Sequence, residues 1–245
     1  MTIISQLKQL TKHNYVTIST RGNTAINAAV ALVPETKKTL IPQEGGWLSY
    51  QKIKNIEYVK CKDSILDLKD LEQKLKKFDC GALLYQNPGG YFAPQQMKEI
   101  YELCKKYDCI VILDVSGAIG TDMCNGRFAD IIVGSFGKWK LVEAHVGGFV
   151  STNNKKLHDK MLVDELTDTK ALKVISQKLT KLRSRIDFLL TLRHKVVNDL
   201  SSFDIVHEDT EGFVVVVKFK NDQEKSSIVN YCKKNKLPYR ECPRY

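Results

Sequence analysis

The sequence contains no hydrophobic run that approaches the roughly 20 residues needed by a membrane-spanning helix. Its first residues, Met1 to Lys8, contain no apolar stretch of the kind found in a secretory signal. The composition is 43% hydrophobic and 27% charged, which is typical of a folded globular protein and not of a disordered, collagen-like or coiled-coil chain. We therefore expect a folded protein with neither a membrane span nor a secretion signal.

Metal-binding and disulfide patterns are also missing. The seven cysteines are odd in number and include no Cys-x-x-Cys pair, and the five histidines are scattered along the chain. No metal site and no disulfide framework are predicted. Free cysteines in apolar or helical patterns favour a reducing compartment, so we expect a cytoplasmic protein.

The net charge is +10, with 38 Lys and Arg residues against 28 Asp and Glu residues. A basic balance can indicate binding to nucleic acid or to a membrane surface. Here, however, the lysines are distributed over many segments, at positions typical of solvated helix faces. We therefore expect a lysine-rich surface in water, and neither nucleic acid nor a membrane as a partner.

Between Tyr15 and Ser151, short apolar runs alternate with amphipathic stretches. The run 110–113 is apolar throughout, and the stretch 93–107 carries apolar residues at helical spacing. Strands buried on both sides, separated by helices, predict an α/β fold with a mostly parallel sheet of the seven-stranded type and helices on both faces.

The pattern changes after Asn153. Residues 155–201 have helical spacing almost throughout, which indicates one long helix or two in sequence. A strand over 212–219 and a helix over 222–234 follow. We predict a large domain over residues 1–165, and a long linking helix with a small α+β C-terminal domain over 166–245.

Polar residues follow several of the predicted strands, and ligands of open α/β sheets bind at the carboxyl ends of strands. Gly22, Asn23 and Thr24 stand where a strand gives way to a helix, so their N–H groups and the Thr hydroxyl could bind a phosphate. A plain helix N-cap is the alternative. Asp114 closes the strand 110–113, where it could hold a metal, a ribose or a protonated ring nitrogen.

Two loops could contact a flat ligand. Trp47 follows a Gly-Gly pair and could stack on an aromatic ring, although it could equally be a core residue. Asn87 stands in an Asn-Pro-Gly-Gly turn, where it could donate a hydrogen bond to a ligand or serve only the turn.

A further strand end carries Ser135, Lys138 and Lys140. A lysine at such a position can form a Schiff base with an aldehyde when its neighbours lower its pKa. Two surface lysines in a loop are the alternative.

The order of these features resembles the fold type I pyridoxal-phosphate enzymes. Asp114 followed by the stretch 117–120 (Gly-Ala-Ile-Gly) looks like the acid-plus-glycine stretch of the sugar-aminotransferase (DegT-like) and class V families. The segment 129–139 is similar to the class V segment before the Schiff-base lysine. The stretch 147–150 (Gly-Gly-Phe-Val) resembles the strand that follows that lysine.

This resemblance implies an aminotransferase that uses pyridoxal phosphate on an amino acid or amino sugar, through a lysine internal aldimine. It implies a homodimer and a small-molecule amino substrate. Asp114 would keep the ring nitrogen protonated. The cofactor-binding residues would be those at the strand ends: Gly22, Asn23, Thr24, Trp47, Asn87, Asp114 and Ser135.

The identity of the catalytic lysine depends on the relative chosen. Counting Ser-x-x-Lys, as in class V relatives, selects Lys138, whereas counting Ser-Phe-x-x-x-Lys and then the glycine pair, as in DegT-like relatives, selects Lys140. We favour Lys138.

Two other functions remain open. A pyridoxal-phosphate lyase or cysteine desulfurase would need a reactive thiol, for which Cys242 is a candidate. A shortened relative without catalysis would act as a binding protein. Arg21, Arg240 and Arg244 are candidates to bind a substrate carboxylate.

Overall fold

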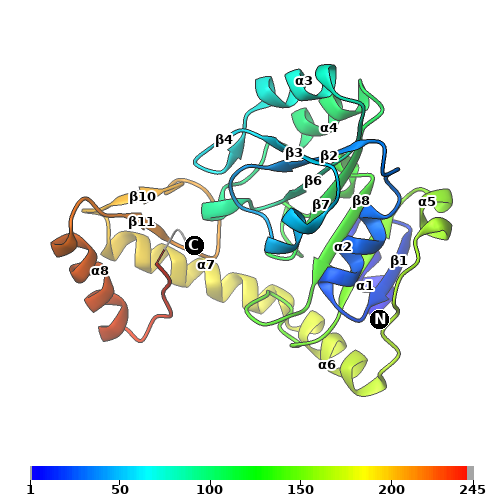
Figure 1. Ribbon diagram of the computed structural model, residues 1–245. Helices are drawn as coiled ribbons and strands as arrows, with labels where there is room; N and C mark the ends of the chain where they lie inside the picture. Colours follow the sequence, from blue (N-terminus) through cyan, green and yellow to red (C-terminus); the bar gives the residue numbers. More distant parts are fainter. Residues whose placement is uncertain (1, 242–245) are drawn as a thin grey trace.

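A seven-stranded sheet forms the centre of the protein in the computed structural model, which describes residues 2–241 (Figure 1). From one edge to the other, its strands are β1 (Tyr15–Ser19), β9 (Gly148–Thr152), β8 (Ile131–Ser135), β7 (Ile110–Asp114), β6 (Cys80–Gln86), β2 (Lys38–Pro42) and β3 (Ile56–Val59). β9 is antiparallel to β1 and β8, whereas the strands from β8 to β3 are parallel to one another. The predicted mostly parallel sheet is confirmed.

Helices cover both faces of this sheet. The α-helices of the chain are α1 (Ile3–Thr11), α2 (Gly22–Val30), α3 (Leu68–Lys77), α4 (Met97–Lys105), α5 (Lys155–Lys160), α6 (Thr169–Thr180), α7 (Leu182–Asp199) and α8 (Asp222–Lys234), of which α8 lies apart from the sheet (Figure 1). The short 3-10 helices are η1 (Leu48–Lys52), η2 (Gly90–Phe92) and η3 (Gly126–Phe128).

The alternation of side chains along β7 explains the two layers. Val111 and Leu113 join a core cluster that includes Leu71 of α3 and Ile100 of α4, while Ile112 joins a second cluster on the other face with residues of α2. Successive side chains of a strand point to opposite faces. A strand that is apolar at every position therefore requires helices on both sides.

The helical stretch predicted over 155–201 is interrupted. α5 ends at Lys160 and α6 begins only at Thr169, after the N-cap residue Asp168. The residues between them run along the outer edge of β1, where Thr20 N–H donates to Asp164 C=O (2.9 Å) and Leu166 N–H donates to Ile18 C=O (3.0 Å). The expected helical stretch is therefore wrong over 161–168, where pairing with an edge strand outweighs local helical spacing, whereas α6 and α7 are two helices in sequence as expected.

A small unit follows α7. The strands β10 (Asp204–Val206) and β11 (Val216–Lys218) pair in antiparallel fashion and pack with α8 around a cluster that includes Val197 and Ile205 (Figure 1). β11 is shorter than the predicted strand 212–219, whereas α8 has the predicted bounds. The division of the chain at residue 165 stays a prediction.

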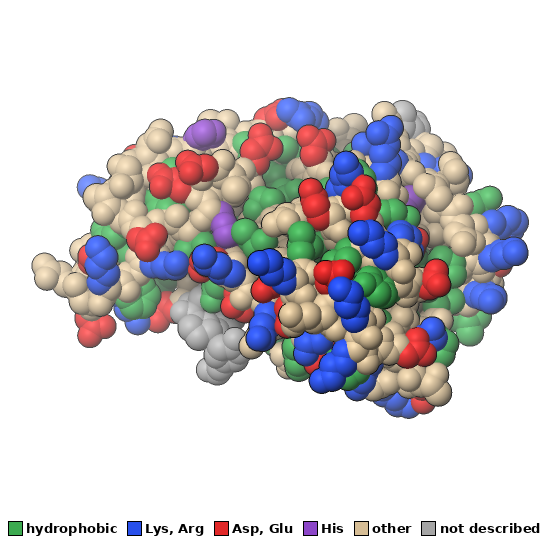
Figure 2. All heavy atoms as spheres, turned by 90° about the horizontal axis from the view of Figure 1, so that it is seen from above, with side chains coloured by type: hydrophobic (Ala, Val, Ile, Leu, Met, Phe, Trp, Pro, Cys, Tyr) green, Lys and Arg blue, Asp and Glu red, His purple; other side chains and the backbone are tan. Residues whose placement is uncertain are grey.

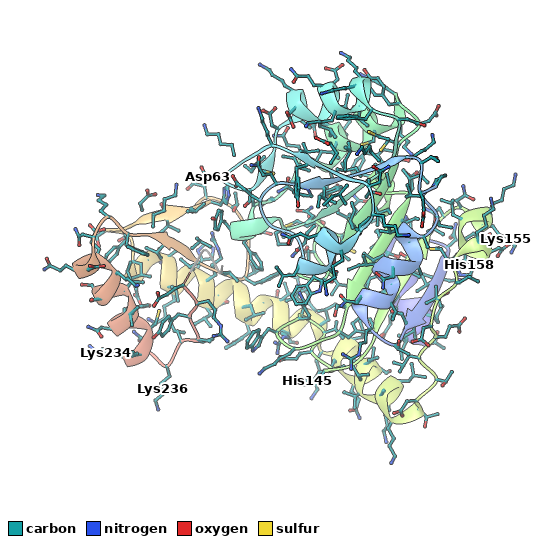
Figure 3. The ribbon with its side chains drawn as sticks, viewed as in Figure 1. Asp63, His145, Lys155, His158, Lys234 and Lys236 are labelled. Atoms are coloured by element: carbon teal, nitrogen blue, oxygen red, sulfur yellow. The ribbon has the colours of Figure 1, made fainter. Side chains whose placement is uncertain are left out.

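The small unit contacts a hairpin of the sheet unit, formed by β4 (Cys61–Lys62) and β5 (Ile65–Leu66). Asp63, at the hairpin turn, is labelled in Figure 3 on the side of the sheet unit that faces β10 and β11. Its carbonyl oxygen lies 2.7 Å from His207 Nε2, and its carboxylate lies 3.4 Å from Lys218 Nζ. Phe92 and Phe213 add an edge-to-face contact at 6.2 Å.

Charged side chains of both signs lie over the face seen in Figure 2, and Lys and Arg outnumber Asp and Glu there. Several lysines have an acidic partner one helical turn away, such as Lys155 with Asp159 and Lys195 with Asp199. Within residues 2–241, no helix has the length and apolar character that crossing a membrane requires.

The contribution of α6 to the sheet core can be tested at Ile175, which is fully buried. Ile175→Ala should lower the free energy of unfolding by about 2–5 kcal/mol, the usual effect of emptying a buried aliphatic site. Val174→Ala is the matched control, because the Val174 side chain is 39% exposed on the same helix. Denaturant unfolding measures both, and an equal loss in the two variants would contradict the packing of α6 in the core.

Candidate active site

The ends of three strands and the start of one helix meet at one point of the sheet. Asp114 ends β7 and Ser135 ends β8, and Asp114 pairs in register with Val133, so Ser135 lies about 6–7 Å farther along the neighbouring strand. Gly148, which begins the antiparallel β9, pairs with both Ser135 and Ser19. β9 therefore connects the end of β8 with the end of β1, from which α2 begins.

Two glycines bring the first turn of α2 against this strand end. A Cβ atom at Gly22 would lie 2.6 Å from Ser135 Cβ, and one at Gly148 would lie 2.7 Å from the Gly22 nitrogen. Such distances exclude any side chain at either position. The N–H groups at the start of α2 are thereby held close to the Ser135 hydroxyl, and a helix N-terminus next to a hydroxyl suits an anion.

Thr24 and Asn23 occupy the same turn. The Thr24 hydroxyl accepts a hydrogen bond from Arg21 N–H (3.2 Å) and donates one to Arg21 C=O (2.7 Å), so it closes the first turn of α2 in this structure. Asn23 is exposed. Phosphate binding by these two side chains stays a prediction.

Asp114 is buried, with 3% of its surface exposed, and two donors hold its carboxylate. The Tyr50 hydroxyl donates to Oδ2 (2.8 Å) and the Ser116 N–H donates to Oδ1 (2.9 Å). Burial and the neighbouring Asp114 raise the pKa of Tyr50 well above its usual range, so the phenol remains a donor. A buried carboxylate is stable only when it is hydrogen-bonded in this way.

Sequence reasoning missed Tyr50. The Gly45-Gly46 pair drew attention to Trp47, which follows it and is predicted to stack on an aromatic ring. In the structure, a Cβ atom at Gly46 would lie 2.8 Å from the Tyr50 ring, so at Gly46 the close approach is made to Tyr50. The Trp47 side chain is 51% exposed, and its stacking on a ligand stays a prediction. The Gly-Gly pair was the available signal, but it did not identify which aromatic residue lies inside.

Asn87 is fully buried and bonded within the protein. Its Oδ1 accepts from Gln95 N–H (3.1 Å), and its Nδ2 donates to Met123 C=O (3.3 Å). Its backbone N–H donates to Asp114 C=O (3.0 Å). Asn87 therefore fixes the loop after β6 to the end of β7, and a hydrogen bond from its side chain to a ligand stays a prediction.

The two candidate lysines differ in their surroundings. Lys138 is exposed, and its Nζ lies 4.8 Å from the ring centroid of Trp139. Lys140 is half-buried and precedes the buried residues Leu141 and Val142. Arg240, one of the candidate carboxylate ligands, contacts the same Trp139 ring at 5.2 Å.

Other candidates fall elsewhere. Cys242 and Arg244 lie outside the described residues. In the part of the chain that the structure describes, no three His, Cys, Asp or Glu side chains are grouped so that they could hold a metal ion.

Comparison with proteins of known sequence identifies one curated relative. The chain is 36% identical over 112 residues to the UDP-4-amino-4,6-dideoxy-N-acetyl-beta-L-altrosamine transaminase of Campylobacter jejuni subsp. jejuni. The match covers 43% of this chain and 29% of the relative, so the matched segment spans less than a third of the length of the relative.

Solved structures share the fold. Serine palmitoyltransferase from S. paucimobilis, with a bound pyridoxal-phosphate adduct of myriocin, superposes with a TM-score of 0.70 at 16% identity, over 97% of this chain and 67% of that chain. Cystathionine γ-synthase from Xanthomonas oryzae pv. oryzae gives a TM-score of 0.65 at 16% identity, over 82% and 55%. These likenesses establish a fold type I architecture for the chain.

The model of one protein family matches residues 59–181, half of the 245-residue chain, from the third strand of the sheet to the end of α6. This range includes Asp114, Ser135 and the loop between β8 and β9 that carries Lys138 and Lys140 (the lysine loop). The chain belongs to the DegT/DnrJ/EryC1/StrS aminotransferase family.

Proposed function

We propose that the protein is a pyridoxal-phosphate-dependent aminotransferase that acts on an amino acid or amino sugar. The observation that carries this proposal is the arrangement at the strand ends, where the buried Asp114 lies on the strand next to Ser135 and the first turn of α2 packs on Ser135. Family membership and the amino-sugar transaminase named above support the same reaction class.

The residues present fit the cofactor. The start of α2 at Gly22, with the Ser135 hydroxyl, supplies N–H and O–H donors for a phosphate. The Thr24 hydroxyl would have to give up its hydrogen bond to Arg21 C=O in order to donate to the same phosphate. The two oxygens of Asp114 each have one protein donor, and a carboxylate can accept about four hydrogen bonds, so a ring N–H can still be accommodated.

Pyridoxal phosphate, when bound, withdraws electrons from the substrate carbon that carries the amino group, provided that its ring nitrogen is protonated. The negative charge of Asp114 favours the proton on that nitrogen. Tyr50 and Ser116 fix the direction of the carboxylate. These residues therefore act by holding one proton in place.

Lys140 is the residue that we propose to take and return the proton at the substrate carbon. The spacing Ser-Phe-x-x-x-Lys of DegT-like relatives selects Lys140, and the chain belongs to that family. The half-buried position of Lys140 supports the same choice, since Lys138 is exposed and lies against Trp139. We therefore propose Lys140, two residues after Lys138, which the sequence alone favoured.

We also propose a homodimer in the cytoplasm. The resemblance to fold type I enzymes supports the homodimer, and the exposed rings of Trp47 (51%) and Trp139 (63%) are candidates for its interface. The six cysteines within the described residues are all free, which suits a reducing compartment.

Transfer of an amino group tests the function directly. The full chain with pyridoxal phosphate should move ¹⁵N from a labelled amino donor to a keto acid or keto sugar acceptor, as followed by mass spectrometry. Breakdown of the donor without transfer of nitrogen would favour a lyase. No change in any donor or acceptor would favour the binding protein.

Asp114→Asn should preserve the fold but reduce amino transfer by at least about 100-fold, because a neutral amide no longer favours the ring proton. Asp122→Asn is the control, since Asp122 is exposed. Turnover is measured at saturating cofactor, and circular dichroism checks the fold. Asp114→Asn activity equal to that of the control would refute the assignment.

Ser135→Ala and Thr24→Ala should each weaken cofactor binding by about 1.5–3 kcal/mol, the value of a hydrogen bond to a charged group. Fluorescence titration with pyridoxal phosphate measures the dissociation constants. Thr180→Ala, which removes a hydroxyl bonded within α6, is the control and should leave them unchanged. Unchanged affinity in both site variants would exclude the phosphate role.

Reduction with borohydride in the presence of pyridoxal phosphate, followed by digestion and mass spectrometry, should find the pyridoxyl group on Lys140. Lys140→Ala should then abolish amino transfer, whereas Lys138→Ala should retain it within about tenfold, as expected for a charge outside the reacting atoms. A pyridoxyl group found on Lys138 instead would restore the class V register.

A further inference from the structure

The connection between β8 and β9, residues 136–147, forms a closed loop that carries Lys140. Phe136 N–H donates to Gly147 C=O (3.0 Å) and Ala144 N–H donates to Phe136 C=O (2.9 Å), so both ends of the loop are fixed. His145, labelled in Figure 3, marks this loop near the junction at which α6 ends and α7 begins. These hydrogen bonds fix the two ends of the loop, and other contacts must fix the backbone at its tip, around Trp139 and Lys140.

Trp139 stands at the tip in an unusual backbone conformation. Its φ of 63° lies in the left-handed region, which residues with a Cβ atom rarely adopt. Such a conformation persists only where neighbouring groups hold it. Trp139 directly precedes Lys140, so its backbone angles set the direction in which the Lys140 side chain leaves the loop.

The group that holds this conformation is the Glu143 carboxylate. Trp139 N–H donates to Glu143 Oε1 at 2.6 Å, across a turn of four residues. The other oxygen, Oε2, lies 3.3 Å from Arg185 Nη2 on α7. Each carboxylate oxygen of Glu143 thus has its own partner: Trp139 N–H in the loop for one, and Arg185 on α7 for the other.

The Glu143 side chain is 21% exposed and the Arg185 side chain 38%, so the pair is partly shielded from water. The hydrogen bond from Trp139 lowers the pKa of Glu143, burial acts in the opposite direction, and Arg185 lowers it further. The carboxylate therefore stays charged, and charge-assisted hydrogen bonds are stronger than neutral ones.

We propose that Glu143, held in place by Arg185, is a positioning residue that directs the Lys140 amine toward the site at the strand ends. This inference rests on the proposed function, because it takes Lys140 as the reacting amine. Lys138 precedes the turn at Trp139, so the Glu143 contact does not set its direction. The inference therefore predicts a change in the reactivity of Lys140 relative to Lys138.

The test measures the pyridoxyl label on each lysine after incubation of the full chain with pyridoxal phosphate and brief reduction with borohydride. Glu143→Ala should lower the rate of labelling at Lys140 at least tenfold and leave the rate at Lys138 within about twofold. Glu143→Gln should recover part of the rate, because its amide oxygen can still accept from Trp139 N–H. Arg185→Met should give an intermediate rate.

Arg183→Met is the matched control. Arg183 lies on the same helix, is 80% exposed and pairs with Asp187 away from the loop, so its removal should leave Lys140 labelling unchanged. Thermal unfolding checks that each variant is folded, and Glu143→Gln and Arg185→Met carry the test if Glu143→Ala does not fold. Labelling of Lys140 at the wild-type rate in folded Glu143→Ala, or in both conservative variants, would overturn the inference.

Acetylation of the protein with acetic anhydride provides a measurement that needs no cofactor. The ratio of acetylation at Lys140 to that at Lys138 should change in Glu143→Ala and stay constant in Arg183→Met. If the wild-type protein acquired no pyridoxyl label on either lysine, the proposed function would fail, and the acetylation ratio would then decide the positioning role alone. An unchanged ratio in Glu143→Ala would overturn it.

Discussion

The contact between the first turn of α2 and the end of β8 determines the geometry of the whole site. It is possible because β9 runs antiparallel between β1 and β8, so that Gly148 lies beside the ends of both. Any Cβ atom at Gly22 or Gly148 would collide with Ser135 or with the α2 backbone. Two residues without side chains thus bring the positive end of a helix to the edge of the sheet at which Asp114 ends its strand.

Two carboxylates around this contact are held by other groups of the protein. Tyr50 and the Ser116 N–H hold the Asp114 carboxylate. Glu143 holds the backbone of Trp139, and Arg185 holds Glu143. Arg185 lies near the start of α7, where it contacts the loop that carries Lys140. The other end of α7 packs in the small unit through Val197, so the same helix contacts both parts.

Sequence patterns predicted the elements whose signals are local. The apolar run at 110–113 identified β7 and its burial on both faces, and the spacing over 222–234 gave α8 with the observed bounds. α1 was not predicted, although Thr2 caps it and Leu7 is fully buried. The break before α6 was also missed, because the pairing of 161–168 with β1 depends on residues more than 140 positions away.

The sequence also predicted part of the candidate site, namely which residues lie at the ends of its strands. Asp114, Ser135 and Gly22 could be placed together, because ligand sites of open sheets lie at the carboxyl ends of strands. The pairs that support the candidate site could not be predicted, since Tyr50 lies 64 residues from Asp114 and Arg185 lies 42 residues from Glu143. Such pairs leave no periodic signal in a single sequence.

Titration of the full chain with pyridoxal phosphate, followed by absorbance in the near-visible region, tests the central claim most directly. The account predicts a new band that saturates at one cofactor per chain, disappears on borohydride reduction and is much weaker with pyridoxal, which lacks the phosphate that α2 and Ser135 would bind. A spectrum equal to the sum of free protein and free cofactor at every concentration would contradict it.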